Sequence, residues 1–340
     1  MPSMRKRFNL AMMPRFIVHI LLLAVIALSS ACARSQATVP RIGFLSATTP
    51  DSAVTLNQLA GFRQGLREQG YVEGTNIAIE YRFAHQRFER LPDLARELIG
   101  LPVDVLVTAV TQASVAAKDN TKTIPIVMAA VADPVGAGLV STLARPGGNV
   151  TGTSSMSVAT AAKSLELLKE AVPGIRRVAV LWNPANRIFQ MQMVRETEAA
   201  ARSLGIQLQM YEAHDLPSIE RAFETISKER VAGLNVLADP TLNTHAPRIA
   251  ALAAKARLPS VSGIGLYAEA GGLMGYGANF YELYRSAAGY VAKILKGAKP
   301  ADLPIEQPTK FELVINMKTA KQLRVSLPQS LLVRADRVIE

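Results

Sequence analysis

Short apolar runs alternate along the chain with longer segments in which apolar residues recur at helical spacing. Leu56, Leu59, Phe62 and Leu66 follow that spacing and predict a helix that ends at Gly70. The apolar runs predict strands over 40–46, 77–82, 103–108, 124–130, 178–182, 206–211, 232–238, 259–262, 271–277 and 311–315. Further helices are predicted over 88–99, 111–120, 161–172, 189–204, 216–229, 245–256, 279–296 and 316–323. Alternating strands and helices predict an α/β protein of parallel sheets with helices on both faces, and the repeated order suggests a duplicated architecture.

One connection is much longer than the others and separates two similar halves. The apolar run 124–130 ends before Asp133-Pro134, and the chain becomes extended again only at Val150. Gly136 and Gly138 allow a tight turn, and the Arg-Pro-Gly-Gly-Asn run at 145–149 is a second break. A long loop in a compact domain is usually functional. We therefore expect it to form the wall of a site and the first crossing between two lobes.

The first 33 residues predict the compartment. Arg5-Lys-Arg7 is followed by an apolar stretch from Phe16 to Ser30, and then by small residues around Cys32. Basic, apolar and small segments in this order are typical of a secretory signal. The apolar stretch is short for a membrane-spanning helix of about 20 residues, although a retained anchor stays an alternative. We expect a periplasmic or extracytoplasmic protein in which 34–40 is a polar tether.

Cys32 is the sole cysteine, and two kinds of processing fit its surroundings. Leu28-Ser-Ser-Ala-Cys32 resembles a bacterial lipoprotein box, in which the cysteine is lipidated and becomes the mature N-terminus, although Ser29 is an imperfect match. Ala31-Cys-Ala33 also fits an ordinary cleavage site that would leave Arg34 first. We favour lipidation at Cys32, which would attach the protein to a membrane. Either outcome leaves a mature protein without a disulfide.

Length and charge narrow the possible partners. The 340 residues are 49% hydrophobic, which is ample for a sizeable core and suggests about two domains. Of the formal net charge of +11, four positives (Arg5, Lys6, Arg7 and Arg15) lie in the signal segment. The remaining charge is scattered, without a basic run or interleaved aromatic residues. We therefore expect no nucleic-acid partner, and we expect a monomer.

Ligands of open α/β sheets bind outside the carboxyl ends of the strands. The loops at these ends are rich in hydroxyl, amide and small residues, which form hydrogen bonds without burying a charge. The ligand-binding residues expected there are Ser46, Ala47, Thr111, Gln112, Asp133, Asn183, Asn186, Asp239, Thr241, Ser262, Gly263 and Glu269. Thr111 or Gln112 begins a helix, and free N–H groups at such a start favour an anion such as a carboxylate.

Each of these residues also has an alternative role in local structure. Hydroxyls and amides at strand ends cap helices and close turns. Asp133 and Asp239 each precede a proline, and each can receive a ligand ammonium or form an Asx turn or cap. Glu269 is a further ammonium candidate. Aromatic residues that could stack on a ligand or belong to the core are Trp182, Tyr267 and Tyr276.

Motifs for catalysis, cofactors and metals do not stand out. The chain has no GxSxG elbow and no P-loop, and Gly136–Ser141 approaches a dinucleotide fingerprint but lacks its third glycine. His85, His214 and His245 are far apart and lack metal-ligand spacing. Paired catalytic carboxylates stay open, but nothing in the sequence nominates a pair. We expect no cofactor, no metal site and no enzyme activity.

The long loop contains the phrase Asp133-Pro-Val-Gly-Ala-Gly-Leu-Val-Ser-Thr-Leu-Ala-Arg-Pro-Gly-Gly-Asn-Val-Thr-Gly152. This phrase resembles a hallmark of the ABC-transporter substrate-binding proteins related to tryptophan-type binding proteins. Further matches are Arg41-Ile-Gly-Phe-Leu, Asn183-Pro-Ala-Asn186, Ile315-Asn-Met-Lys-Thr-Ala-Lys and the C-terminal segment 327–339. The resemblance covers residues 40–340.

The resemblance implies a type I periplasmic-binding-protein fold, with two Rossmann-like lobes joined by a hinge of three segments. On that pattern the N-lobe contains 40–152 plus 278–315, and the C-lobe contains 153–277 plus 316–340. The crossings are expected near Gly152–Ser154, Gly275–Ala278 and Ile315–Asn316, with the glycines of the first two acting as hinges.

The function implied is capture of a small molecule between the lobes and its delivery to the membrane subunits of an ABC permease. An amino acid-like ligand is expected, because members with known ligands bind such molecules. The alternative is a ligand-sensing binding protein for a membrane signalling receptor. An exported enzyme of unrecognised type is a third hypothesis. A transcriptional regulator of this fold is not expected, since a signal segment occupies the place of a DNA-binding domain.

Overall fold

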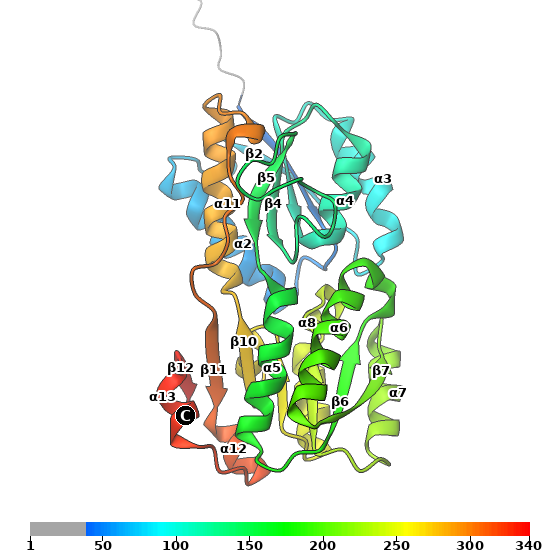
Figure 1. The fold of residues 1–340 in the computed structure, drawn as a ribbon. Coiled ribbons are helices and arrows are strands. Elements are labelled where there is room, and N and C mark those ends of the chain that lie inside the picture. Colours follow the sequence, from blue (N-terminus) through cyan, green and yellow to red (C-terminus); the bar gives the residue numbers. More distant parts are fainter. Residues whose placement is uncertain (1–38) are drawn as a thin grey trace, which may run out of the picture. The chain divides into compact units, whose positions relative to one another are not determined.

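The computed structural model describes residues 39–340, and the predicted signal and Cys32 lie outside this part of the chain. Residues Pro40–Glu340 belong to one unit, which contains two sheets. We call the parts built around these sheets the first lobe and the second lobe (Figure 1). Within 39–340, none of the helices combines the length and the apolar character needed to cross a membrane.

The first lobe contains a wholly parallel sheet of five strands in the order β2-β1-β3-β4-β5. These strands are β1 (Arg41–Ser46), β2 (Ala78–Phe83), β3 (Val105–Ala109), β4 (Ile126–Val131) and β5 (Val150–Ser154). Every residue of β3, β4 and β5 is buried. This burial explains why the strands are continuous apolar or small-residue runs, since helices cover both faces of the sheet.

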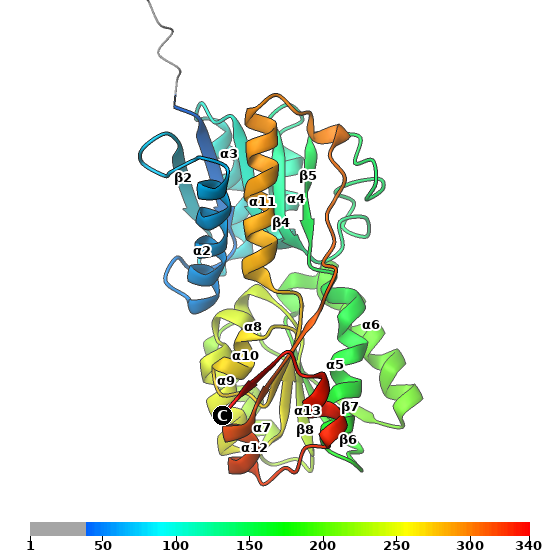
Figure 2. The same ribbon diagram turned by 90° about the vertical axis from the view of Figure 1, so that its left-hand side faces the viewer.

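Two helix pairs cover this sheet. The helices are α2 (Ala53–Glu68), η2 (Phe88–Arg90), α3 (Leu91–Ile99), α4 (Val110–Asn120), α11 (Phe280–Leu295) and η4 (Pro300–Asp302). Helices α3 and α4 pack together on one face, and α2 packs with α11 on the other. Figure 2 shows α11 lying along the sheet, although it follows the second lobe in the sequence.

The second lobe contains a sheet of seven strands in the order β12-β11-β10-β9-β8-β6-β7. Its strands are β6 (Arg177–Trp182), β7 (Gln207–Glu212), β8 (Gly233–Val236), β9 (Ser260–Ser262), β10 (Met274–Gly277), β11 (Glu312–Asn316) and β12 (Arg337–Ile339). The pairing is parallel except between β10 and β11. The expectation of purely parallel sheets therefore fails at β11.

Helices cover both faces of this sheet as well. They are α5 (Ser157–Ala171), η3 (Pro184–Asn186), α6 (Arg187–Leu204), α7 (Leu216–Ile226), α8 (Pro240–Thr244), α9 (Ala246–Lys255), α10 (Leu266–Glu269), α12 (Met317–Leu323) and α13 (Gln329–Arg334). Helices α5 and α6 pack against each other, and the pair formed by α7 and α9 lies on the opposite face. The two-lobed α/β architecture predicted from the sequence is confirmed.

Three segments connect the lobes, and one of them lies elsewhere than expected. The chain crosses after β5, between β10 and α11, and between Glu306 and β11. Glu306 still belongs to the first lobe, because its backbone bonds Gly152 and Ser154 on the edge strand β5. The placement of 311–315 in the N-lobe, with a crossing at Ile315–Asn316, is wrong, since β11 pairs with β10 and β12.

The long loop between Asp133 and Asn149 is not the first crossing either. It joins β4 to β5, which are neighbours in the same sheet. Gly152 also has a structural role other than that of a hinge. Its φ is +131°, and a Cβ there would lie 2.0 Å from the carbonyl oxygen of Met128 on β4. Glycine at this position therefore permits the close approach of two paired strands.

Candidate functional site

A small cavity lies between the lobes, where strand ends and helix starts of both sheets meet. Its volume is about 30 Å³. We call it the inner chamber. It is lined by Thr48, Val54, Gln58, Val110, Thr111, Gln112, Ala130, Ala132, Ser155, Ser157, Phe189, Ala238, Asp239, Pro240, Asn243 and Phe280. The lining combines the carboxyl ends of β3 and β4 with the starts of α4 and α5 and the loop after β8, the edge at which α/β proteins bind ligands.

Two helices begin at the inner chamber without a side-chain cap. Helix α4 starts from extended Ala109, and α5 starts from Met156 in the left-handed region. Among the helices of eight or more residues within 39–340, α2, α7 and α11 are capped by side chains, and α3, α6 and α9 continue from a preceding helical turn. The first-turn N–H groups of α4 and α5 therefore lack a side-chain acceptor, and each start carries a partial positive charge. One belongs to each lobe.

The backbone around the inner chamber adopts uncommon conformations. Val110, Ala130 and Met156 have φ values of 66°, 57° and 52°. For β-branched Val110 this left-handed conformation is a marked outlier, and such a residue costs about 1–3 kcal/mol. Val110 and Ala130 line the chamber, and Met156 lies between the lining residues Ser155 and Ser157. Strained residues cluster at ligand sites, so this concentration supports the chamber as the functional site.

Asp239 supplies a buried carboxyl group in the chamber wall. Its exposed fraction is 1%. Oδ1 accepts hydrogen bonds from Asn183 Nδ2 at 3.0 Å and from the N–H groups of Thr241 and Leu242 at 2.8 and 3.2 Å. Oδ2 accepts one bond, from Asn186 Nδ2 at 2.8 Å, so it has capacity for another donor. Burial raises the pKa of the Asp239 carboxyl, and the hydrogen bonds oppose that rise.

Two amide side chains at the chamber have polar atoms without partners. Neither Gln112 Nε2 nor Gln112 Oε1 has a hydrogen-bond partner among the described residues, and both atoms are buried. Asn243 Oδ1 is likewise buried and has no hydrogen-bond partner among the described residues. Burying an unpaired polar group costs about 1–3 kcal/mol. These atoms are therefore suited to bond a ligand that enters the cleft.

A second cavity lies on the other side of Gln112. Its volume is about 290 Å³, and Thr111 and Gln112 line both cavities. We call it the outer chamber. It is lined by Phe88, Leu91, Pro92, Thr111, Gln112, Val115, Ala116, Asp119, Ala185, Asn186 and Arg187. Helices α3 and α4 of the first lobe form one wall, and η3 and the start of α6 in the second lobe form the other.

The expected ligand contacts divide into three groups. Thr111, Gln112 and Asp239 line the inner chamber, and Asn186 lines the outer one. Asn183 lies behind Asp239 and orients it through the bond to Oδ1. The Asn-Pro-Ala-Asn segment therefore reaches the site in two ways, directly through Ala185 and Asn186 in the outer chamber and indirectly through the aspartate that it holds.

A second group supports the site without lining it. The Ser46 hydroxyl bonds the hydroxyl of the lining residue Thr48 at 2.8 Å. Ala47 is fully buried beside it. Thr241 donates its N–H to Asp239. These positions keep a local structural role, the alternative that the sequence left open.

The remaining residues face neither chamber. Asp133 Oδ1 accepts from the N–H of Gly136, three residues on, at 2.9 Å, which is the cap-type bond that its sequence allows. Glu269 pairs with Arg337 on the side of the crossings. Ser262 is buried in β9, and the carbonyl of Gly263 packs against Gly277. Among the aromatic candidates, Tyr267 is a core residue whose hydroxyl bonds Ser260.

Sequence reasoning missed several residues that line the inner chamber. Phe189 and Phe280 supply its aromatic side chains. Each lies in the first turn of a helix, where an apolar residue has the same sequence pattern as an ordinary core residue. Ser155 and Ser157 were missed because the apolar spacing placed the start of α5 at 161 instead of 157. Asn243 lies on the short helix α8, at residues for which the sequence predicted no helix.

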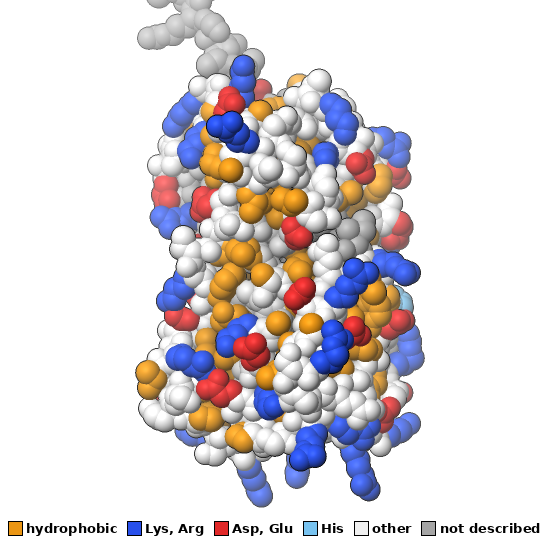
Figure 3. Space-filling model, in the orientation of Figure 1, with side chains coloured by type: hydrophobic (Ala, Val, Ile, Leu, Met, Phe, Trp, Pro, Cys, Tyr) orange, Lys and Arg blue, Asp and Glu red, His pale blue; other side chains and the backbone are white. Residues whose placement is uncertain are grey.

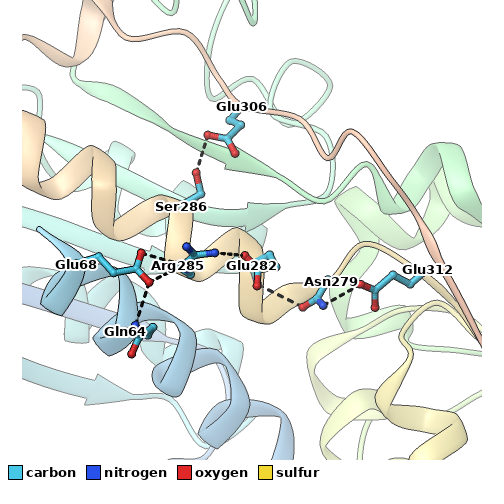
Figure 4. Close-up of polar contacts among 8 residues, drawn as sticks. All are labelled: Gln64, Glu68, Asn279, Glu282, Arg285, Ser286, Glu306 and Glu312. Carbon is cyan, nitrogen blue, oxygen red and sulfur yellow. Dashed lines mark hydrogen bonds and ion pairs between the residues drawn. The ribbon is translucent and has the colours of Figure 1, made fainter. Parts of the chain in front are cut away.

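A cavity of about 720 Å³ lies outside the cleft. Its charged side chains largely satisfy one another (Figure 4). Arg285 bonds Glu68 at 2.9 Å and Glu282 at 2.8 Å, while Asn279 caps α11 and bonds Glu312 at 3.0 Å. Because these groups have partners, we assign them to the packing of α2, α11 and the third crossing.

Residues 51–339 match the model of a protein family described as ABC transporter substrate binding protein. The chain belongs to this family. The substrate-binding protein has the type I periplasmic-binding-protein fold that the sequence resemblance implied, and the resemblance itself is confirmed. The match includes most of both lobes.

Three relatives give the comparison more detail. The chain is 29% identical to a tyrosine-binding protein of Clostridioides difficile (strain R20291), over 77% of this chain and 75% of that protein. It is 26% identical to a domain from Streptococcus pneumonia solved in complex with L-Trp, with a TM-score of 0.80 over 89% of this chain and all of that one. A substrate binding protein with adhesive properties from Clostridium difficile, in a ligand-free, open structure, is also 26% identical, with a TM-score of 0.63 over 88% of this chain and 99% of that one.

Proposed function

We propose that this substrate-binding protein captures an amino acid with an aromatic side chain in its cleft and delivers it to the membrane subunits of an ABC permease. One observation carries the proposal: the uncapped starts of α4 and α5 face the inner chamber from different lobes, together with the buried carboxyl of Asp239. Positive helix ends and a carboxylate in one chamber complement a zwitterion.

Each charged group of an amino acid has a counterpart in this arrangement. The ligand carboxylate would accept hydrogen bonds from the first-turn N–H groups of α4 and α5, which have no side-chain acceptor. The ligand ammonium would donate to Asp239 Oδ2, and Asn243 Oδ1 is a second acceptor nearby. These contacts involve only the ammonium and carboxylate groups of the ligand, so they suit any α-amino acid.

Relatives support an aromatic side chain. The related proteins include a tyrosine-binding protein and a domain in complex with L-Trp. The outer chamber also has an aromatic residue of its own, Phe88, against which an aromatic ligand could pack.

Closure of the lobes would couple binding to delivery. A ligand held by α4 and α5 contacts both lobes at once, and it favours the closed arrangement by its greater affinity for it. The TM-score is higher for the L-Trp complex than for the ligand-free, open structure, although identity and coverage are similar. This difference supports a closed arrangement of the lobes here. A hydrogen bond of 3.1 Å between Gln86 of the first lobe and His245 of the second agrees with it.

The family supports an extracytoplasmic location and work with a permease. The signal-like N-terminus adds to this, and Cys32 would provide a lipid anchor at a membrane. A receptor-linked sensor would use the same closure, but the family match favours transport.

A thermal-shift screen followed by isothermal titration tests the proposal. The purified mature protein would be heated with each proteinogenic amino acid and with sugars, nucleosides and aromatic acids as comparison classes. Binding to the folded state alone raises the melting temperature by mass action. We expect shifts with L-tyrosine or L-tryptophan. A shift confined to sugars or nucleosides would contradict the proposed ligand class.

A further inference from the structure

We propose that the outer chamber receives the side chain of the amino acid, while its ammonium and carboxylate groups bond polar residues that line the inner chamber. Gln112 lies at the boundary and contacts the ligand where the two parts meet. This inference rests on the proposed function and divides its site into a charge-recognising part and a size-selecting part.

The volumes of the two chambers place the side chain in the outer one. The inner chamber, at about 30 Å³, has room comparable to one water molecule. The outer chamber, at about 290 Å³, is close to the lower end of the range for small-molecule pockets. An aromatic ring therefore fits the outer chamber and not the inner one while the lobes keep this arrangement.

The chemistry of the walls divides in the same way. The groups suited to a zwitterion, namely Asp239, Asn243 and the start of α5, line the inner chamber alone. The outer chamber has apolar side chains on its first-lobe wall, where half-buried Phe88 and Val115 flank buried Leu91. A ring entering there finds Phe88 to pack against.

Gln112 connects the two parts. It lies on the first turn of α4, and Ala116 and Asp119 follow it at helical spacing along the wall of the outer chamber. Its amide nitrogen and oxygen are buried and lack partners in the described chain. A ligand that spans both chambers passes this amide and can satisfy it.

Filling the outer chamber tests the inference. Val115→Trp adds a ring to its wall, and Val333→Trp adds the same ring at a position that is 74% exposed in the second lobe. Isothermal titration would measure L-tryptophan, L-tyrosine and L-alanine against each variant and the wild type. We expect the wild type to bind L-tryptophan or L-tyrosine at least tenfold more tightly than L-alanine. Val115→Trp should weaken aromatic binding at least tenfold, and Val333→Trp should leave it within twofold.

The outcomes separate the two proposals. If the wild type binds an aromatic amino acid and folded Val115→Trp binds it within twofold of the wild type, the side-chain subsite is wrong and the proposed function stands. If the wild type binds no amino acid, both fall. Should Val115→Trp not fold, as judged by its melting curve, Phe88→Ala replaces it. Loss of that ring should weaken aromatic binding more than threefold, and unchanged binding would overturn the subsite.

Discussion

At the scale of single residues, the site depends on polar groups whose burial is unfavourable in the absence of a ligand. Asp239 illustrates this, since its buried carboxyl has four hydrogen-bond donors but no cation among the described residues. Its sequence context, an aspartate before a proline, allowed both a helix cap and an ammonium receptor. The structure confirms the cap on α8. It also leaves Oδ2 with capacity for a ligand, because three of the four bonds go to Oδ1.

Asp239 gives a prediction about pH. Burial raises the pKa of this carboxyl in the folded protein, so the unligated site takes up a proton at higher pH than an ordinary aspartate. An ammonium ligand binds the ionised form. Affinity should therefore be greatest above the raised pKa and should decline as pH falls through it. Titration calorimetry from pH 4 to pH 8 would measure this. Asp239→Asn should weaken binding at least tenfold at pH 7 and flatten the profile, and an unaltered profile would contradict the ammonium contact.

The same pKa shift affects stability in the opposite direction. A carboxyl with a raised folded pKa contributes stability that is fully present below its unfolded pKa and is lost as pH rises through the folded pKa. Ionised Asp239 therefore costs the unligated protein some stability at neutral pH, and the ligand would offset this cost. Function and stability conflict at this residue.

Gln112 leads to a second prediction of this kind. Its unpaired amide costs about 1–3 kcal/mol in the unligated fold, so Gln112→Leu should leave the free energy of unfolding unchanged or raise it. The same substitution should weaken amino-acid binding at least fivefold. Urea unfolding and titration calorimetry on one preparation would measure both. Gln329→Leu, at an exposed position of α13, is the control and should change neither. A loss of stability without a loss of affinity would assign Gln112 a purely structural role.

At the scale of elements, the sequence predicted most strands and helices because their apolar spacing is regular. It did not predict α13 and β12, which are short, largely exposed apart from Leu331, and stabilised by contacts with distant segments. The direction of β11 could not be predicted from the sequence either, because an apolar run has the same pattern in a parallel or an antiparallel pair. The uncapped starts of α4 and α5 are a tertiary feature, as a missing cap is meaningful only when a cavity lies in front of it.

The packing of α2 against α11 gives an element-scale prediction. A Cβ at Gly61 would lie 2.2 Å from the carbonyl oxygen of Tyr281, whereas one at Gly289, in the interior of α11, would meet no atom within 4 Å. Gly61→Ala should destabilise the fold by about 1–3 kcal/mol through overpacking. Gly289→Ala should stabilise it by about 0.5–1 kcal/mol, because alanine is the better helix former. Thermal and urea unfolding would compare them. Equal effects of both substitutions would show that helix propensity, and not contact, decides.

At the scale of the whole molecule, the distribution of surface charge says little about function, and the geometry of the cleft says more. Figure 3 shows Lys and Arg side chains spread over both lobes with Asp and Glu among them, and several ion pairs join neighbouring elements within a lobe. The cleft differs from the surface in having its polar groups buried and directed at a cavity. On the proposed function, ligand capture depends on lobe closure, and the crossings would act as its hinge.

A groove on the side of the crossings offers a way to shift closure without touching the ligand. It has a volume of about 450 Å³ and is lined by Asn57 of α2 in the first lobe and by Gly265 and Leu266 in the second, with the second and third crossings between them. The outer chamber lies between α3, α4 and the start of α6, and α3 and α4 cover the face of the first sheet opposite to α2. If the lobes rotate about the crossings, widening the outer chamber must narrow this groove. A bulky side chain in the groove should therefore oppose opening.

Asn57→Trp tests this geometry. The ring would fill part of the groove in the closed arrangement and would clash as the lobes open, so the unligated protein should populate the closed form more. Apparent affinity is reduced by the fraction of molecules that are not binding-competent. We therefore expect affinity to rise about threefold to tenfold, with a smaller radius of gyration for the unligated variant in solution scattering. Leu56→Trp, at the neighbouring position that is 54% exposed, adds the same ring outside the groove and should change neither quantity. A lower affinity for Asn57→Trp would mean that the groove widens on opening, which would place the rotation axis away from the three crossings.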